Sequence, residues 1–178
     1  MVEHRLTDRM LDLIRREILT LRNGSGGVDI GFAGQVVDFF RTYVDLCHHG
    51  KEEDILFKAL AGKEMSSAHR DIMDELIEEH RTARSVITGL DQARSLHSGG
   101  DDKASEIAGI YEEIMELYPP HIEKEDKHFF FPCLEYLSDD EQDRMLAEMR
   151  DFDAKLFHHT YVALIERLEK GPTGQNRG

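Results

Sequence analysis

Residues 48–57 read HHGKEEDILF, and within this stretch His48 precedes Glu52 by four positions. On an α-helix this spacing places both side chains on one face, about 6 Å apart, where they could bind one metal ion or bridge two. The same spacing recurs at His121 and Glu125. A helical fold built around a metal site is therefore the first hypothesis for this chain.

Apolar residues recur every three or four positions along most of the chain, which is typical of amphipathic helices. Glycine-rich turns such as residues 23–27 separate the helical stretches. Short turns between long helices predict an all-α fold, an up-down-up-down four-helix bundle with an additional C-terminal helix. The prolines Pro119 and Pro120 are expected to kink the fourth helix or to start a new segment. The helices are predicted over residues 3–22, 29–61, 66–98, 101–131 and 138–170, in one domain spanning residues 1–170 with a disordered tail at 171–178.

Four histidines fall at matching heights in such a bundle. Each consecutive pair lies nearly equidistant from the turn between its helices, and because a helix rises 1.5 Å per residue, the side chains should meet at one level. A single buried histidine is most often a hydrogen-bonded core residue. Several of them beside two glutamates would leave costly desolvated charge unless a cation is bound. The residues concerned are His4, His48, His80 and His121, with Glu52 and Glu125.

This donor set predicts a dinuclear metal site. Imidazole and carboxylate ligands suit iron, manganese or zinc better than calcium or magnesium. Four histidines and two glutamates exceed the needs of one tetrahedral zinc ion. Two metals that share both carboxylates, with two histidines each, use all six residues and leave positions open for a small exogenous ligand. We therefore expect a non-haem di-iron centre with the metal ligands His4, His48, Glu52, His80, His121 and Glu125.

Four stretches that contain these residues resemble the hemerythrin-like (HHE cation-binding) family: MVEHRL, HHGKEEDILF, EEHR and HIEKEDKHFFFP. Their order and spacing look like the family's H-HxxxE-H-HxxxE pattern, and the resemblance spans roughly residues 1–170. It implies a four-helix bundle around two Fe ions joined by an oxo or hydroxo bridge. It also implies a protein that binds O2, senses oxygen or redox state, handles iron, or decomposes peroxide or nitric oxide.

One position departs from the oxygen-carrying members of the family that the chain resembles. Those proteins have a second histidine one turn after the third-helix ligand, and here that position holds Arg84. One iron would lose a ligand and become more open, which favours redox reactivity over stable O2 carriage. The i+4 spacing favours Glu125 over Asp126 as the carboxylate ligand, although the choice between them stays open. Further ligands could come from His49, Glu53, Asp126, His128 or His158, with packing the expected role of His158.

Composition argues against several classes of partner. With 22 basic and 36 acidic residues, the net charge is −14, which disfavours nucleic acid and anionic membrane surfaces. No apolar run approaches the roughly 20 residues that span a bilayer, and no secretory signal is visible. Two cysteines are too few for a disulfide framework. A cytoplasmic protein is therefore expected.

Two main functional hypotheses follow from the metal site. The first is a di-iron protein that binds or reacts with O2, peroxide or nitric oxide, in sensing or detoxification. As an enzyme it would be a peroxide- or nitric-oxide-consuming oxidoreductase. The alternative is a protein that stores, delivers or senses iron without turnover, and a bundle without metal is the third hypothesis. The expected partners are a small diatomic ligand or peroxide and a separate redox partner protein, and the oligomeric state stays open.

Overall fold

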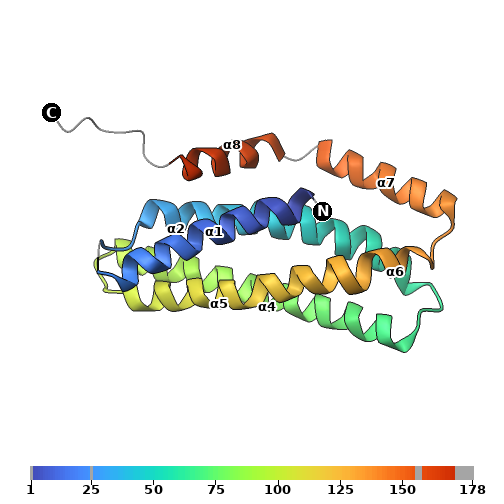
Figure 1. Cartoon of the computed structure of the whole chain (residues 1–178), viewed down its shortest axis with the longest axis horizontal. Coiled ribbons are helices and arrows are strands. Elements are labelled where there is room, and N and C mark those ends of the chain that lie inside the picture. The colour runs from blue at the N-terminus through green and yellow to red at the C-terminus, as the bar shows by residue number, and fades with distance from the viewer. Residues whose placement is uncertain (1, 25, 155–157, 171–178) are drawn as a thin grey trace.

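The chain folds into an all-helical bundle (Figure 1). A computed structural model describes residues 2–24, 26–154 and 158–170, and no strand occurs within these ranges. Four long helical segments lie side by side, and two further helices run along one side of them (Figure 1). The four segments cover residues 2–22, 30–61, 67–98 and 104–134. The predicted all-α class is confirmed, and the up-down order of the segments stays a prediction.

The end of the first segment and the start of the second coincide with a glycine turn and a capping aspartate. Helix α1 (Val2–Arg22) stops before Gly24, whose φ of 62° lies in the left-handed region that glycine adopts most readily. Helix α2 (Ile30–Asp38) starts after Asp29, whose carboxylate accepts a hydrogen bond from the backbone N–H of Phe32 at 2.9 Å. Local capping therefore explains these two boundaries.

The second segment does not keep the α-helical hydrogen-bond pattern throughout. It continues as the π-helical stretches η1 (Phe39–His49) and η2 (Glu52–Phe57), followed by a last turn, α3 (Lys58–Ala61). At the end of η1 the backbone N–H of Gly50 donates to the carbonyl of Asp45, five residues earlier rather than four. Such wider turns are rare and occur frequently at functional sites. They change which side chains share a face of the helix, so the regular helix predicted here is only partly right.

The third and fourth segments are also long helices. Helix α4 (Ser67–Ser98) starts after Ser66, whose hydroxyl accepts a hydrogen bond from the backbone N–H of His69 at 3.2 Å. This contact explains why the third segment begins at Ser67. The fourth segment consists of α5 (Ala104–Lys124), the π-helical stretch η3 (Glu125–Phe129) and the short helix α6 (Phe130–Leu134).

Helix α5 continues through Pro119 and Pro120, where we expected a kink or a new segment. Each proline lacks the N–H that would bond to the carbonyl four residues earlier, so the carbonyls of Met115 and Glu116 lose that partner. Both prolines and Glu116 are exposed, and water can therefore reach this face of the helix. The helix does not end at the prolines, and its hydrogen-bond pattern changes only after Lys124.

The C-terminal part runs back along the bundle as α7 (Asp139–Ala154) and α8 (His158–Glu169) (Figure 1). Ser138 and Glu141 form a capping box before α7. The Glu141 carboxylate accepts from the Ser138 N–H at 2.9 Å, and the Ser138 hydroxyl accepts from the Glu141 N–H at 3.4 Å. The helix predicted over 138–170 is thus described as two helices. Residues 155–157 and the expected disordered tail at 171–178 lie outside the described residues.

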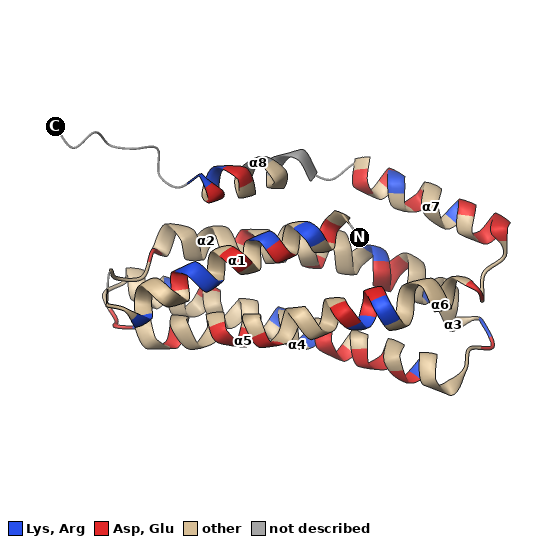
Figure 2. Cartoon of the chain, in the orientation of Figure 1, with Lys and Arg blue, Asp and Glu red and all other residues tan. Residues whose placement is uncertain are grey.

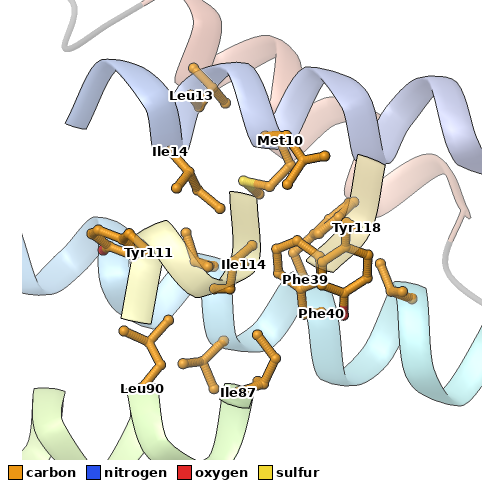
Figure 3. Close-up of a cluster of buried hydrophobic side chains, with 14 of the residues drawn as sticks. Met10, Leu13, Ile14, Phe39, Phe40, Ile87, Leu90, Tyr111, Ile114 and Tyr118 are labelled. Atoms are coloured by element: carbon orange, nitrogen blue, oxygen red, sulfur yellow. The ribbon is translucent and has the colours of Figure 1, made fainter. Parts of the chain in front are cut away.

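Two hydrophobic clusters fill the interior of the bundle. The larger one combines side chains of α1, α4, α5 and the second segment, which point toward one another (Figure 3). The smaller one includes Leu60, Leu76 and Phe129, all of them fully buried. The larger cluster contains Met10, Ile14, Phe39, Phe40, Ile87, Leu90, Tyr111, Ile114 and Tyr118. Along α4, His80 lies between Leu76 of the smaller cluster and Ala83 of the larger one, so a buried polar layer divides the core.

Charged residues are spread along the helices (Figure 2), and in the chain as a whole 36 acidic residues outnumber 22 basic ones. Among the described helices, none combines the length and the apolar character needed to cross a membrane.

Leu90 tests the larger cluster, because its side chain is fully buried in α4. Leu90→Ala is expected to lower the free energy of unfolding by about 2–5 kcal/mol, since it removes buried methyl groups and leaves a cavity. Urea denaturation followed by circular dichroism on metal-free protein measures the change. Leu96→Ala on the same helix is the control, because Leu96 is 46% exposed. It should change the free energy by less than about 0.5 kcal/mol, and equal losses in the two variants would contradict the described core.

Candidate metal centre

The six side chains predicted as metal ligands converge in the polar layer between the two clusters. Each of them is buried, with at most 4% of its surface exposed. Every long segment contributes: His4 comes from α1, His48 and Glu52 from η1 and η2, His80 from α4, and His121 and Glu125 from α5 and η3. The structure therefore brings all six together, and their role as ligands stays a prediction.

Four of these residues form one compact group of donor atoms. The Nε2 atoms of His4 and His48 are 3.0 Å apart, and Nε2 of His4 lies 3.1 Å from Oε2 of Glu125. Glu52 approaches with Oε1, 3.5 Å from Nε2 of His48. Donor atoms of all four residues lie within 4.8 Å of one another. One ion could therefore contact this set, which is termed the His4 group.

A second group contains a histidine that the sequence offered only as an additional candidate. His49, His80 and His121 each present a ring nitrogen within 4.8 Å of the others. The rings of His49 and His80 stack with centroids 3.8 Å apart and 11° between their planes. The ring of His121 lies 5.1 Å from that of His80. This set of three buried imidazoles is termed the His49 group.

The two glutamates link the two groups. Glu125 reaches the His4 group through Oε2, and its Oε1 lies 3.3 Å from Nε2 of His121. Glu52 also contacts both groups. Its Oε1 faces His48, and its Oε2 lies 3.4 Å from Nε2 of His80. Each carboxylate thus presents one oxygen to each set of imidazoles. Two ions that share bridging carboxylates need this arrangement.

Four further carboxylates contact the outward-facing nitrogens of the histidine rings. The pairs are His4 Nδ1 with Asp126 at 3.0 Å, His80 Nδ1 with Glu53 at 2.8 Å, His121 Nδ1 with Glu79 at 2.7 Å and His49 Nδ1 with Asp45 at 3.4 Å. A carboxylate beside Nδ1 favours a proton on that nitrogen and leaves the lone pair of Nε2 available to a metal. Hydrogen bonds to Glu53 and Glu79 therefore hold the rings of His80 and His121 in the orientation that metal ligands require, whereas Nδ1 of His4 and of His49 makes a contact without a hydrogen bond.

Burial and neighbouring charges shift the pKa values of the two glutamates in opposite directions. Burial raises the pKa of Glu52 well above its usual value, and the Glu125 carboxylate raises it further. Burial would also raise the pKa of Glu125, but contacts with His121 and His4 hold it well below its usual value. Burial lowers the pKa of His121, but Glu125 and Glu79 outweigh this effect and raise it to about 9. Negative charge therefore gathers on Glu125, where imidazolium balances it.

Several polar atoms in this layer are buried without a hydrogen bond. They are, among others, both carboxylate oxygens of Glu52 and of Glu125 and the Nε2 atoms of His49, His80 and His121. Leaving a buried polar atom unpaired costs about 1–3 kcal/mol, and a coordinated cation would remove that cost. Nitrogen and carboxylate donors suit iron, manganese or zinc. The residues present therefore fit a pair of transition-metal ions.

The other candidate ligands lie outside the buried polar layer or outside the described residues. Glu53 and Asp126 contact histidines from outside the layer, and Glu125 rather than Asp126 reaches its centre. His128 is exposed on η3. The side chain of His158, at the start of α8, lies outside the described residues. The i+4 argument in favour of Glu125 therefore agrees with the observed geometry.

His49 joins the layer because of the π-helical backbone. On an α-helix, adjacent residues point about 100° apart, so His48 and His49 would be directed toward different parts of the interior. In η1 the turn is wider, each residue advances by a smaller angle, and both rings are buried. The adjacency of the two histidines was the only sequence signal for His49.

Arg84 stands at the outer edge of the layer. Its Nε atom donates to Asp45 at 2.7 Å, and one terminal nitrogen donates to Glu53 at 2.8 Å. A cavity of about 230 Å³ lies beside it, lined among others by His49 and Tyr118. A small molecule in this cavity would contact the edge of the His49 group.

A model of the hemerythrin HHE cation binding domain family matches residues 1–130 of the chain. The match includes all seven buried histidines and glutamates described above, and it ends where α6 begins, before α7 and α8. Comparisons with curated proteins and with solved structures found no match. Because the matched residues make up most of the chain and contain the whole buried polar layer, the chain belongs to the hemerythrin HHE cation-binding domain family.

Proposed function

We propose that this domain holds two iron ions and that its function is redox chemistry with O2, peroxide or nitric oxide, in sensing or detoxification. One observation carries the proposal: both buried carboxylates divide their oxygens between two groups of imidazoles. Family membership supports cation binding, and the donor set supports a transition metal. The proposed ligands are His4, His48, Glu52, His80, His121 and Glu125.

Two ions account for the donor atoms better than one ion does. The donors form two groups, each compact enough for a single ion. One tetrahedral ion takes four donors, and an ion in the His4 group would leave Nε2 of His80 and of His121 unpaired in the interior. Iron is preferred among the candidate metals because histidine and glutamate projecting from neighbouring helices are the setting of di-iron sites in bundles.

Bound iron would supply an electron donor or acceptor with positions open to a small ligand. The chain's own residues would exclude water and hold protons around it. Phe130 stacks on His4 with ring centroids 5.8 Å apart, and Phe57 lies 6.0 Å from His80, so aromatic rings shield both groups. Glu53 keeps the proton of His80 on the outer nitrogen.

The charges around the site support redox reactivity rather than O2 carriage alone. Two carboxylates lie in the centre and four more contact the histidine rings from outside. Anionic neighbours stabilise the more highly charged ferric ion. The cavity beside His49 gives a small molecule access to the layer. Together these features favour a centre that changes oxidation state when a small oxidant arrives.

Storage, delivery or sensing of iron without turnover is the alternative function. The net charge of −14 favours it to some degree, because an acidic surface attracts cations. Both functions require metal bound in the buried polar layer, so they are distinguished only by whether the bound metal reacts with O2, peroxide or nitric oxide.

We also propose that α7 and α8 complete the same domain, up to residue 170. Asp153 of α7 contacts the ammonium of Lys51 at 2.5 Å, and Tyr161 of α8 donates to Asp38 at 3.1 Å. Both contacts connect these helices to the segment that carries His48. An up-down-up-down order of the four segments, a cytoplasmic location and a separate redox partner belong to the same proposal.

Iron content and absorption spectra test the proposed function directly. Protein loaded with ferrous iron under anaerobic conditions is expected to hold about two irons per chain, and oxidation should produce the near-ultraviolet band of a bridged ferric pair. Rapid consumption of added peroxide would support redox function. Two irons without any such consumption would favour the alternative. An iron content well below one atom per chain would contradict the metal site itself.

Removal of single ligands should lower both iron content and stability. Glu52→Ala and His121→Ala are expected to lose iron, because each residue contributes to a buried group. An ion present at about 100 times its Kd stabilises the folded state by about 2.7 kcal/mol, so both variants should lose most of the rise in Tm that iron gives the parent protein. Elemental analysis and thermal denaturation with and without iron measure the two effects.

The matched control for these substitutions is His128→Ala, because His128 is exposed on η3. It should bind as much iron as the parent protein and show the same rise in Tm. If Glu52→Ala and His121→Ala also retain the full iron content, the proposed ligand set is wrong.

A further inference from the structure

His49 is a buried histidine whose ring nitrogens make no hydrogen bond. Its side chain is 1% exposed, and its Nε2 atom makes no hydrogen bond. The ring stacks on His80 and lies with its centroid 5.8 Å from that of His121. A neutral imidazole has one ring nitrogen with a free lone pair, and His49 presents a ring nitrogen within 4.8 Å of those of His80 and His121.

The position one helical turn after His80 holds Arg84, which cannot bind a metal because it stays protonated and has no lone pair to offer. Arg84 instead turns its guanidinium outward, where the side chain is 37% exposed. The second imidazole expected from α4 is therefore missing, and the ring of His49 occupies the space beside His80 from the opposite segment.

Arg84 and the two carboxylates it binds hold this arrangement together. The guanidinium donates to Asp45 at 2.7 Å and to Glu53 at 2.8 Å. Asp45 lies 3.4 Å from Nδ1 of His49, and Glu53 lies 2.8 Å from Nδ1 of His80. A planar guanidinium can contact two carboxylates at once in a fixed geometry. One arginine therefore bridges the two carboxylates that lie beside these neighbouring imidazoles.

We propose that His49 is the third imidazole ligand of one metal ion, together with His80 and His121, and that Arg84 is a positioning residue that orients His49 through Asp45 and His80 through Glu53. This inference rests on the proposed function and adds a seventh ligand to it. The arginine that replaces a histidine ligand on α4 thus supports a different histidine, which the wider turn of η1 brings into the layer.

Removal of His49 tests the ligand directly. His49→Gln and His49→Leu are expected to bind about one iron per chain, because the His4 group remains complete. X-ray absorption should show fewer nitrogen neighbours per bound iron whether the second ion is retained or lost, because two ions share five imidazoles in the parent protein. Circular dichroism and the Tm of the metal-free variants check the fold. The helical signal and the Tm should both match those of the metal-free parent protein, because Nε2 of His49 has no hydrogen-bond partner without a metal. Two irons with an unchanged nitrogen count, or loss of both irons from a folded variant, would overturn the assignment.

Arg84→Ala and Arg84→Lys test the positioning role. Both variants are expected to take up two irons, but to release one of them to a chelator about 10-fold faster than the parent protein does, since removal of groups that orient metal ligands costs about 10–100-fold in metal affinity. A lysine keeps the charge but cannot hold both carboxylates in the same geometry. Unchanged release from both variants would overturn the role of Arg84.

Matched controls separate this inference from the proposed function. Arg81→Ala removes an arginine of the same helix that pairs at the surface with Glu78, and His128→Gln removes an exposed histidine. Both should hold two irons with unchanged release. If the parent protein and these controls hold fewer than two irons, the proposed di-iron function fails. If they hold two and the His49 variants also hold two with an unchanged nitrogen count, only the seventh ligand fails.

Discussion

The burial of two carboxylates in the middle of the bundle is the constraint on which the rest of the structure depends. No oxygen of Glu52 or Glu125 makes a hydrogen bond, and charge in an apolar interior is costly unless it is paired. Imidazole nitrogens surround these oxygens at 3.1 to 3.5 Å. Because the imidazoles come from four segments, all four must be held at one level, and the hydrophobic clusters on either side provide that packing.

The backbone adapts to this layer. The π-helical stretches η1, η2 and η3 carry His48, Glu52 and Glu125, whereas α1 and α4, which contribute one histidine each to the layer, stay α-helical. A wider turn gives up part of the regular hydrogen-bond pattern, but it allows neighbouring residues to face the same point. The irregular stretches therefore occur where one segment has to supply several donors, as at His48 and His49.

Charged residues support the layer from outside and connect it to the rest of the chain. Arg84 joins the carboxylates behind two of the imidazoles. Lys51, which lies between His48 and Glu52 in the sequence, contacts Glu3 of α1 at 2.6 Å and Asp153 of α7 at 2.5 Å. The C-terminal helices, which lie beyond the family match, are thus attached next to the proposed ligands. Loss of the Lys51 ammonium would remove the contacts with both Glu3 and Asp153.

Local sequence determined the helices, their caps and the meeting of six side chains at one level, because the rise of a helix is constant and a cap at Ser66 or Ser138 depends only on nearby backbone groups. Tertiary structure alone decided the place of His49. Periodicity assumes 100° per residue, which directs His49 away from the face of His48, and no local signal announces the wider turn. The contacts of Arg84 with Asp45 and Glu53 also join different segments. Spacing along one helix cannot encode them, because they form only when the packed core has set the distance between the helices.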